Sequence, residues 1–276
     1  MILFLCLNLG FFSYFLINLH ENIVRFCKKK SIKSKKYLLL LVSSPATNEQ
    51  NNPFHSLKII KKMFVLTEKN SIANVFLAEL RDKNIQKDAM RFRRNLERLG
   101  ELFAYEISKT FEYEQTTVQT PLGEKQTMLL GQTPVLATVL RAALPLFNGF
   151  LNVFDNAECA FVGAYRGAHR TDNSFDIEVH YTTVPNLNGK PLILIDPMLA
   201  TGKSIVQIYD KLLQCGTPSY VHIVAAIASK DGIEYVKKHI KNVSLWIGDI
   251  DEELNEKSYI IPGLGDAGDL AFGIKL

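Results

Sequence analysis

The chain has 276 residues, of which 47% are hydrophobic and 22% are charged, and its formal net charge is +4. This composition excludes a disordered, collagen-like or low-complexity protein. Residues 1–62 hold 10 basic and 2 acidic side chains, whereas residues 63–276 hold 22 and 26. The distribution argues against a general nucleic-acid binder, whose basic excess would lie on the folded domain.

The first 62 residues form a leader that has two interpretations. Residues 1–19 are almost wholly apolar, and seven basic residues follow between Arg25 and Lys36. This pattern suits a marginal membrane anchor, and it suits a cleaved signal peptide less well because no basic segment precedes the apolar run. The alternative, which we favour, is that translation starts at Met63. In both cases residues 43–53 form a linker, and one domain is expected over residues 63–276.

Four cysteines, Cys6, Cys27, Cys159 and Cys215, show no spacing typical of a metal site. The simplest expectation for the domain is therefore a reduced, cytoplasmic compartment. Attachment to a membrane is expected only if the leader is translated.

Hydrophobic periodicity predicts the elements of the domain in chain order. Helices are expected over residues 71–79, 90–108, 146–154, 204–213 and 233–239. Strands are expected over residues 134–140, 159–165, 192–195, 221–227 and 244–247, with a hairpin over 116–130 and an extended arm or flap over 175–183. Buried strands that alternate with helices predict a parallel sheet covered on both faces. In such a sheet, ligands bind at the carboxyl ends of the strands.

Residues 192–204, with the sequence LILIDPMLATGKS, are the most informative segment. A buried strand ends at Asp196, a loop of small residues follows, and a helix begins near Ser204. The backbone N–H groups at this helix N-terminus favour an anion. Thr201 and Ser204 add hydroxyl groups, and Gly202 lets the backbone approach closely. The segment predicts a phosphate-binding loop.

Two alternatives apply to this segment. Gly202, Lys203 and Ser204 also match the end of a nucleotide-binding P-loop. That loop needs a glycine five residues before Gly202, where this chain has Pro197 with its fixed φ. Asp196 suits a sugar phosphate better, because its carboxylate would accept hydrogen bonds from ribose hydroxyls. The other alternative is a loop without function that merely starts a helix.

Residues 196–202 resemble the phosphoribosyl pyrophosphate (PRPP) loop of uracil phosphoribosyltransferases, a branch of the type I phosphoribosyltransferases. Residues 259–269, YIIPGLGDAGD, resemble the uracil-binding segment of that family, and residues 140–144 and 164–166 resemble its pyrophosphate loop and flap base. The resemblance extends from about residue 64 to residue 275. It implies an α/β fold: a type I phosphoribosyltransferase-like central parallel sheet with flanking helices, a β-arm or flap, and a small C-terminal base-binding hood.

The resemblance also implies the site residues. Catalytic roles fall on Asp196, Asp266 and Arg141, and uracil contacts fall on Ile260, Gly265, Asp266 and Ala267. The implied PRPP-binding residues are Arg141, Arg166, Asp196, Pro197, Met198, Leu199, Ala200, Thr201, Gly202, Lys203, Ser204 and Asp266.

Physical chemistry agrees with these roles. Guanidinium groups match phosphate oxygens with two hydrogen bonds. A glycine-rich backbone can read the alternating carbonyl and N–H groups of uracil, and it would reject an exocyclic amino group.

The implied reaction belongs to pyrimidine salvage: uracil and PRPP give UMP and pyrophosphate. The PRPP substrate would carry the Mg²⁺ ion, and no protein metal ligand is proposed. The resemblance further implies a homodimer or a higher homo-oligomer, and it raises GTP as an effector without deciding it. No nucleic-acid partner is expected.

Two positions depart from the family pattern. Lys203 replaces a small or polar residue, and Ala143 stands where glycine is usual. If that position needs a positive φ, alanine would be strained there. The alternative function is a catalytically weak sensor that binds uracil or UMP, whereas the C-terminal motif disfavours purine transferases. His169 and His180 are expected on the surface of the flap.

Overall fold

The computed structural model describes residues 63–169 and 175–274. The chain divides into two units, Met1–Ser56 and Leu57–Leu276, and the described residues belong to the second. The leader over residues 1–62 lies outside the described residues, so both interpretations of it stay predictions. Within the described part, no helix has the length and apolarity needed to cross a membrane.

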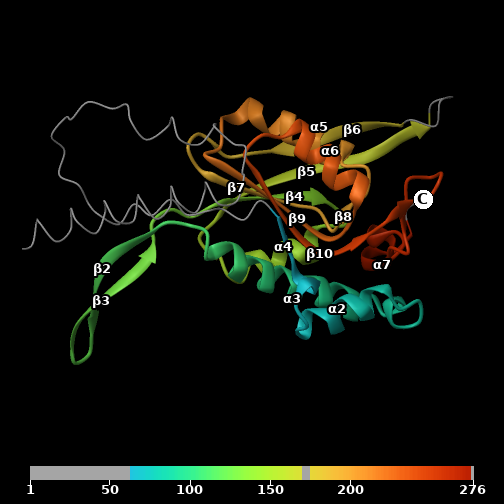
Figure 1. Ribbon diagram of the computed structural model, residues 1–276. Coiled ribbons are helices and arrows are strands. Elements are labelled where there is room, and N and C mark those ends of the chain that lie inside the picture. The colour runs from blue at the N-terminus through green and yellow to red at the C-terminus, as the bar shows by residue number, and fades with distance from the viewer. Residues whose placement is uncertain (1–62, 170–174, 275–276) are drawn as a thin grey trace, which may run out of the picture. The chain divides into compact units, whose positions relative to one another are not determined.

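An eight-stranded sheet forms the centre of the domain (Figure 1), in the order β1-β10-β9-β7-β4-β5-β6 with β8 beside β9. Every neighbouring pair is parallel except β5 with β6. The mostly parallel sheet expected from the sequence is therefore confirmed. The strands are β1 (Met63–Val65), β4 (Val135–Leu140), β5 (Glu158–His169), β6 (Phe175–Thr183), β7 (Pro191–Ile195), β8 (Met198–Leu199), β9 (Tyr220–Ser229) and β10 (Val243–Asp251).

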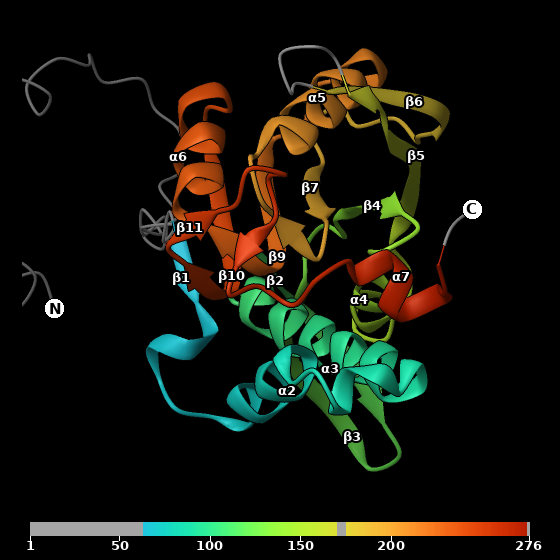
Figure 2. The ribbon, with the colours of Figure 1, turned by 90° about the vertical axis from the view of Figure 1, so that its right-hand side faces the viewer.

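Helices cover both faces of this sheet, as Figure 2 shows. Successive side chains of a strand point to opposite faces. Leu136 of β4 therefore packs in the core with α2, α3 and α4, whereas Val135 and Ala137 pack in a second core with α5 and α6. The helices are α2 (Ile72–Arg81), α3 (Ala89–Ser108), α4 (Leu144–Leu151), α5 (Lys203–Leu212) and α6 (Lys230–His239), with short 3-10 turns at Leu66–Glu68, Ile85–Lys87 and Leu213–Cys215.

Two smaller units complete the domain. The hairpin of β2 (Tyr113–Thr120) and β3 (Gly123–Leu130) forms its own two-stranded sheet, as expected for residues 116–130. At the C-terminal end, β11 (Glu253–Leu254) pairs with β12 (Ile260–Ile261), and α7 (Ala267–Phe272) follows. Arg93 on α3 donates to the Ala271 carbonyl at 2.6 Å, which holds α7 against that helix. These C-terminal elements form the expected hood.

The boundaries of several elements differ from the predicted ones, and polar residues explain most of the differences. β9 and β10 continue to Ser229 and Asp251, beyond the apolar runs on which the predictions depended. α6 begins at Lys230, three residues early, because the Ser229 hydroxyl caps it by accepting from Gly232 N–H. α4 begins at Leu144, since Pro145 fits the first turn of a helix.

Candidate active site

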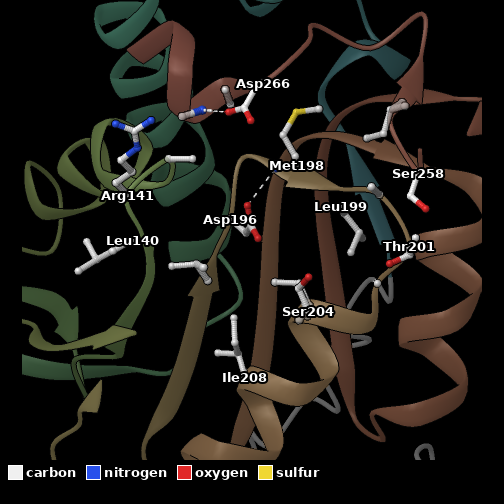
Figure 3. A pocket seen from close by; sticks show the side chains of 18 of the residues that line it. Leu140, Arg141, Asp196, Met198, Leu199, Thr201, Ser204, Ile208, Ser258 and Asp266 are labelled. Atoms are coloured by element: carbon white, nitrogen blue, oxygen red, sulfur yellow. Dashed lines mark hydrogen bonds between the residues drawn. The ribbon is translucent and has the colours of Figure 1, made fainter. Parts of the chain in front are cut away.

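The site lies where two neighbouring parallel strands end. Arg141 follows β4 and Asp196 follows β7, and the two strands are paired with Thr138 opposite Ile195. A cavity of about 500 Å³ opens at this edge of the sheet. The carboxyl ends of the strands, the hood and the base of the flap all contribute to its lining (Figure 3).

The structure brings most of the predicted residues to this one cavity. Pro197 and Lys203 do not line it, and the side chain of Arg166 lies outside the described residues. The predicted residues that line the cavity are Arg141, Asp196, Met198, Leu199, Ala200, Thr201, Gly202, Ser204, Ile260, Gly265, Asp266 and Ala267.

Pro197 and Lys203 have contacts outside the cavity lining, and their predicted roles in PRPP binding stay predictions. The Pro197 carbonyl accepts from Ile227 N–H at 3.1 Å, so this residue joins the loop to β9. Lys203 is exposed and begins α5, and its backbone N–H donates to the Thr201 hydroxyl at 3.4 Å. The Lys203 ammonium is therefore not part of the cavity wall.

The predicted phosphate-binding loop contacts the start of α6. The Ser229 hydroxyl donates to the Ala200 carbonyl at 2.5 Å and accepts from Gly232 N–H at 2.9 Å. Gly202 has φ +74°, and an added Cβ would lie 2.8 Å from the Gly232 carbonyl oxygen. Only glycine fits this position, because it needs both a left-handed backbone and close contact with α6. The loop therefore presents the N-terminus of α5 to the cavity in a fixed geometry.

Polar side chains of this loop face the same space. Asp196 accepts from Met198 N–H at 3.2 Å, which fixes its carboxylate at the end of β7. Figure 3 shows Asp196, Thr201 and Ser204 around the cavity. Hydroxyl and N–H donors at a helix N-terminus suit a phosphate group, and the carboxylate suits hydroxyl donors of a sugar.

Asp266 caps α7, a helix that the sequence interpretation missed. Its Oδ1 atom accepts from Gly268 N–H at 2.9 Å and from Asp269 N–H at 3.0 Å. No helix is expected here from the sequence, because α7 has only six residues, three of which are glycine or alanine. An aspartate followed three residues later by an acidic residue is a helix-start signal that could have found it.

Arg141 joins the loop after β4 to α7. Its Nη2 atom donates to Asp269 Oδ1 and to the Gly273 carbonyl oxygen, both at 2.8 Å. The Leu140–Arg141 peptide bond is cis. Ala143 in the same loop is buried, with φ −77° and ψ −13°. This ordinary helical conformation carries no strain, so the expected cost of alanine at this position is absent.

Further lining residues were not assigned to the site from the sequence, and Tyr181, Ile208, Ser258 and Tyr259 are among them. Ile208 lies four residues after Ser204 on α5, so helical spacing could have placed it on the same face. Tyr181, from the flap, is 56% exposed. Ser258 has φ +61° in the turn before β12, and no local sequence signal predicts that conformation.

The histidines do not contribute to the described part of the cavity. The side chains of His169 and His180 lie outside the described residues. His222 is buried on β9 beside Trp246, whose indole N–H donates to His222 Nδ1 at 3.0 Å. Across the described ranges, no group of three or more His, Cys, Asp or Glu residues could hold a metal ion.

The sequence profile of uracil phosphoribosyltransferases matches residues 66–274. A protein of that name from Porphyromonas gingivalis is 49% identical over 212 residues, which cover 76% of this chain and 98% of the relative. Another from Pyrococcus furiosus is 39% identical over 200 residues, covering 71% and 84%. The solved structure of the AQ2163 protein from Aquifex aeolicus superposes with a TM-score of 0.69 at 31% identity, covering 78% of this chain and 99% of that chain. These similarities confirm the predicted fold and the resemblance of the motifs.

Proposed function

This chain belongs to the uracil phosphoribosyltransferase family, and we propose that it converts uracil and PRPP into UMP and pyrophosphate. The observation that carries the proposal is a single cavity lined by the phosphate-binding loop, Arg141 and the glycine-rich hood. Its volume of about 500 Å³ lies within the usual range of small-molecule sites. A sugar phosphate and a base can therefore meet in one space.

The phosphate-binding loop would hold the 5′-phosphate of PRPP. The N-terminus of α5, with the Thr201 and Ser204 hydroxyls, supplies donors and the positive end of a helix dipole. Asp196 would accept hydrogen bonds from the ribose hydroxyls. These contacts fix the sugar, so that the anomeric carbon stays in line with the base during the transfer.

Arg141 would neutralise charge that develops on the pyrophosphate as its bond to the anomeric carbon breaks and the N-glycosidic bond to uracil forms. Arg166, from the flap, would take part in the same task. Mg²⁺ would arrive with PRPP, because it prefers oxygen ligands and keeps several of its waters. When bound, the ion supplies further neutralisation of the leaving group.

The hood would bind uracil through its backbone. Ile260, Gly265 and Ala267 line the cavity, and their amide and carbonyl groups can match the donor and acceptor pattern of the base. Asp266 stands at the start of α7, where its carboxylate would stabilise positive charge at the anomeric carbon. Closure of the hood over the base would exclude water.

We also propose that the enzyme works as a homo-oligomer in the cytoplasm. The hairpin β2–β3 exposes five large apolar side chains, which suits self-association. They are Tyr113, Val118, Leu122, Met128 and Leu129. The role of GTP as an effector stays a prediction, and no contact among the described residues bears on it.

The test is direct. Purified protein is mixed with uracil, PRPP and Mg²⁺, and UMP is followed by chromatography against a control without enzyme. UMP formation is expected. Uracil binding without UMP formation would favour the sensor. Ala143, which departs from the family pattern, has an ordinary helical conformation and gives that alternative no support.

A further inference from the structure

A partly buried ion-pair cluster lies beside the hood, and its residues are not among those that line the cavity. Arg81, the last residue of α2, has a side chain that is 19% exposed. Its two terminal nitrogens donate to the two carboxylate oxygens of Asp251, both at 2.8 Å, and Nη2 also donates to Asp249 Oδ2 at 2.9 Å. Asp249 in turn accepts from the Thr67 hydroxyl at 3.0 Å. The charges of the cluster are thus paired and hydrogen-bonded.

The cluster holds both backbone polar groups of Gly263. Arg81 Nη1 donates to the Gly263 carbonyl at 3.0 Å, and Gly263 N–H donates to Asp251 Oδ2 at 2.9 Å. Gly263 has φ +58°, and an added Cβ would lie 2.2 Å from the Ile260 carbonyl oxygen. Gly263 is therefore the centre of a tight turn whose conformation depends on these two hydrogen bonds.

The turn at Gly263 lies between two residues that line the cavity. Ile260 lies three residues before Gly263, Gly265 lies two residues after it, and both line the cavity. Pairing with Asp249 and Asp251 would suffice to join α2 to β10. The two bonds to Gly263 add nothing to that connection, but they fix the backbone that faces the base.

We propose that Arg81 and Asp251 are positioning residues for uracil, which act through Gly263 on the backbone groups of Ile260 and Gly265. The inference rests on the proposed uracil contacts of these two residues. A guanidinium can donate to Asp251, Asp249 and Gly263 in one plane, whereas an ammonium presents a single nitrogen. The geometry of arginine, beyond its charge, is therefore required.

Arg81→Lys tests this requirement in the full-length protein. The KM for uracil is expected to rise about tenfold or more, because a charge-assisted hydrogen bond to the turn is lost, while the KM for PRPP stays within about twofold. Arg91→Lys is the matched control. Arg91 pairs with Glu79 at 3.1 Å, between α2 and α3, and its guanidinium donates to no residue of the turn within the described part of the chain. Both KM values of this control should stay at the wild-type level.

Chemical rescue separates positioning from a merely structural role. Arg81→Ala leaves a space for a guanidinium ion, so added guanidinium chloride should lower its KM for uracil, and potassium chloride at equal ionic strength should not. If Arg81→Lys does not fold, Asp249→Asn serves as the second variant. It keeps the pair between Arg81 and Asp251 and should show a smaller rise, again confined to uracil.

The outcomes are distinguishable. A lower melting temperature with an unchanged KM for uracil, or an equal rise in both KM values, would overturn the positioning role. A wild-type protein that makes no UMP would instead refute the proposed function. Substitution of the proposed contact by Gly265→Ala, without any effect on the KM for uracil, would refute the contact assignment on which the inference rests.

Discussion

His222 should make the stability of this protein fall steeply in mild acid. The side chain is 2% exposed on β9 and contacts the rings of Phe111, Tyr220 and Trp246. Burial lowers the pKa of His222 from 6.5 to about 3, because the charged imidazolium would lose its hydration. The Trp246 N–H bond to Nδ1 also requires that nitrogen to be unprotonated.

The sign and size of the effect follow from these pKa values. Below pH 6.5 the unfolded chain binds a proton at His222, whereas the folded protein does not until the pH approaches 3. Stability is therefore full above pH 6.5 and declines as the pH falls toward 3. Within this window, each pH unit lowers the free energy of unfolding by about 1.4 kcal/mol. Between pH 7 and pH 4.5, His222 alone therefore lowers it by about 2.5 kcal/mol.

Urea unfolding at pH 7, 5.5 and 4.5 measures this loss. Carboxylates also titrate in this range, so the informative quantity is the difference between wild type and His222→Gln. Glutamine keeps an acceptor for Trp246 but cannot titrate. The variant should be less stable at pH 7, since aromatic packing is lost, and its stability should fall by about 2.5 kcal/mol less than that of wild type on acidification. Equal declines in the two proteins would refute the argument.

Three further changes have defined outcomes. Gly202→Ala should raise the KM for PRPP at least about tenfold in initial-rate assays and leave the KM for uracil near wild type, because the backbone at φ +74° and the contact with α6 both exclude a Cβ. Thr138→Val should raise the free energy of unfolding by about 1 kcal/mol in urea titrations, since the buried Thr138 hydroxyl has no hydrogen-bond partner among the described residues. Ala143→Gly should lower that free energy by about 1 kcal/mol without increasing the turnover number, because the site is helical and buried; a gain in activity would mean that the alanine is a defect.

The phosphate-binding loop could be predicted from its local sequence. This loop is contiguous in sequence: an apolar strand ends at Asp196, small residues follow, and a helix begins after them. Their spacing alone therefore predicts a phosphate-binding loop. The same holds for the alternation of strands and helices that predicts the sheet. The spacing does not show which side chains of the loop line the cavity: Lys203, in the first turn of α5, is not among the lining residues, and its predicted phosphate contact stays a prediction.

Contacts between distant segments could not be predicted from spacing. Arg81 meets Asp251 across 170 residues, and Arg141 meets Asp269 across 128. No periodicity links such pairs, because tertiary packing alone brings them together. Tyr181 reaches the cavity in the same way, through the pairing of β6 with β5 opposite Gly163.

The charge distribution shows how an acidic domain can hold an anionic substrate. Residues 63–276 carry 22 basic and 26 acidic side chains, so long-range attraction would not explain the proposed binding of PRPP. Local donors would explain it, because the N-terminus of α5 lines the cavity and Asp269 and the Gly273 carbonyl hold the Arg141 side chain at the cavity wall.

Helix α7 therefore has a part in both halves of the proposed reaction. Asp269, in its first turn, holds the arginine assigned to pyrophosphate, while Asp266 and Ala267 at its start line the proposed uracil site. A change in α7 should alter the kinetics of both substrates. The Arg81 guanidinium, in contrast, donates within the described residues to Gly263 at the turn and to Asp249 and Asp251 of β10. If both proposals hold, substitutions at Arg81 should affect the kinetics of uracil alone, whereas substitutions in α7 should affect those of uracil and PRPP together.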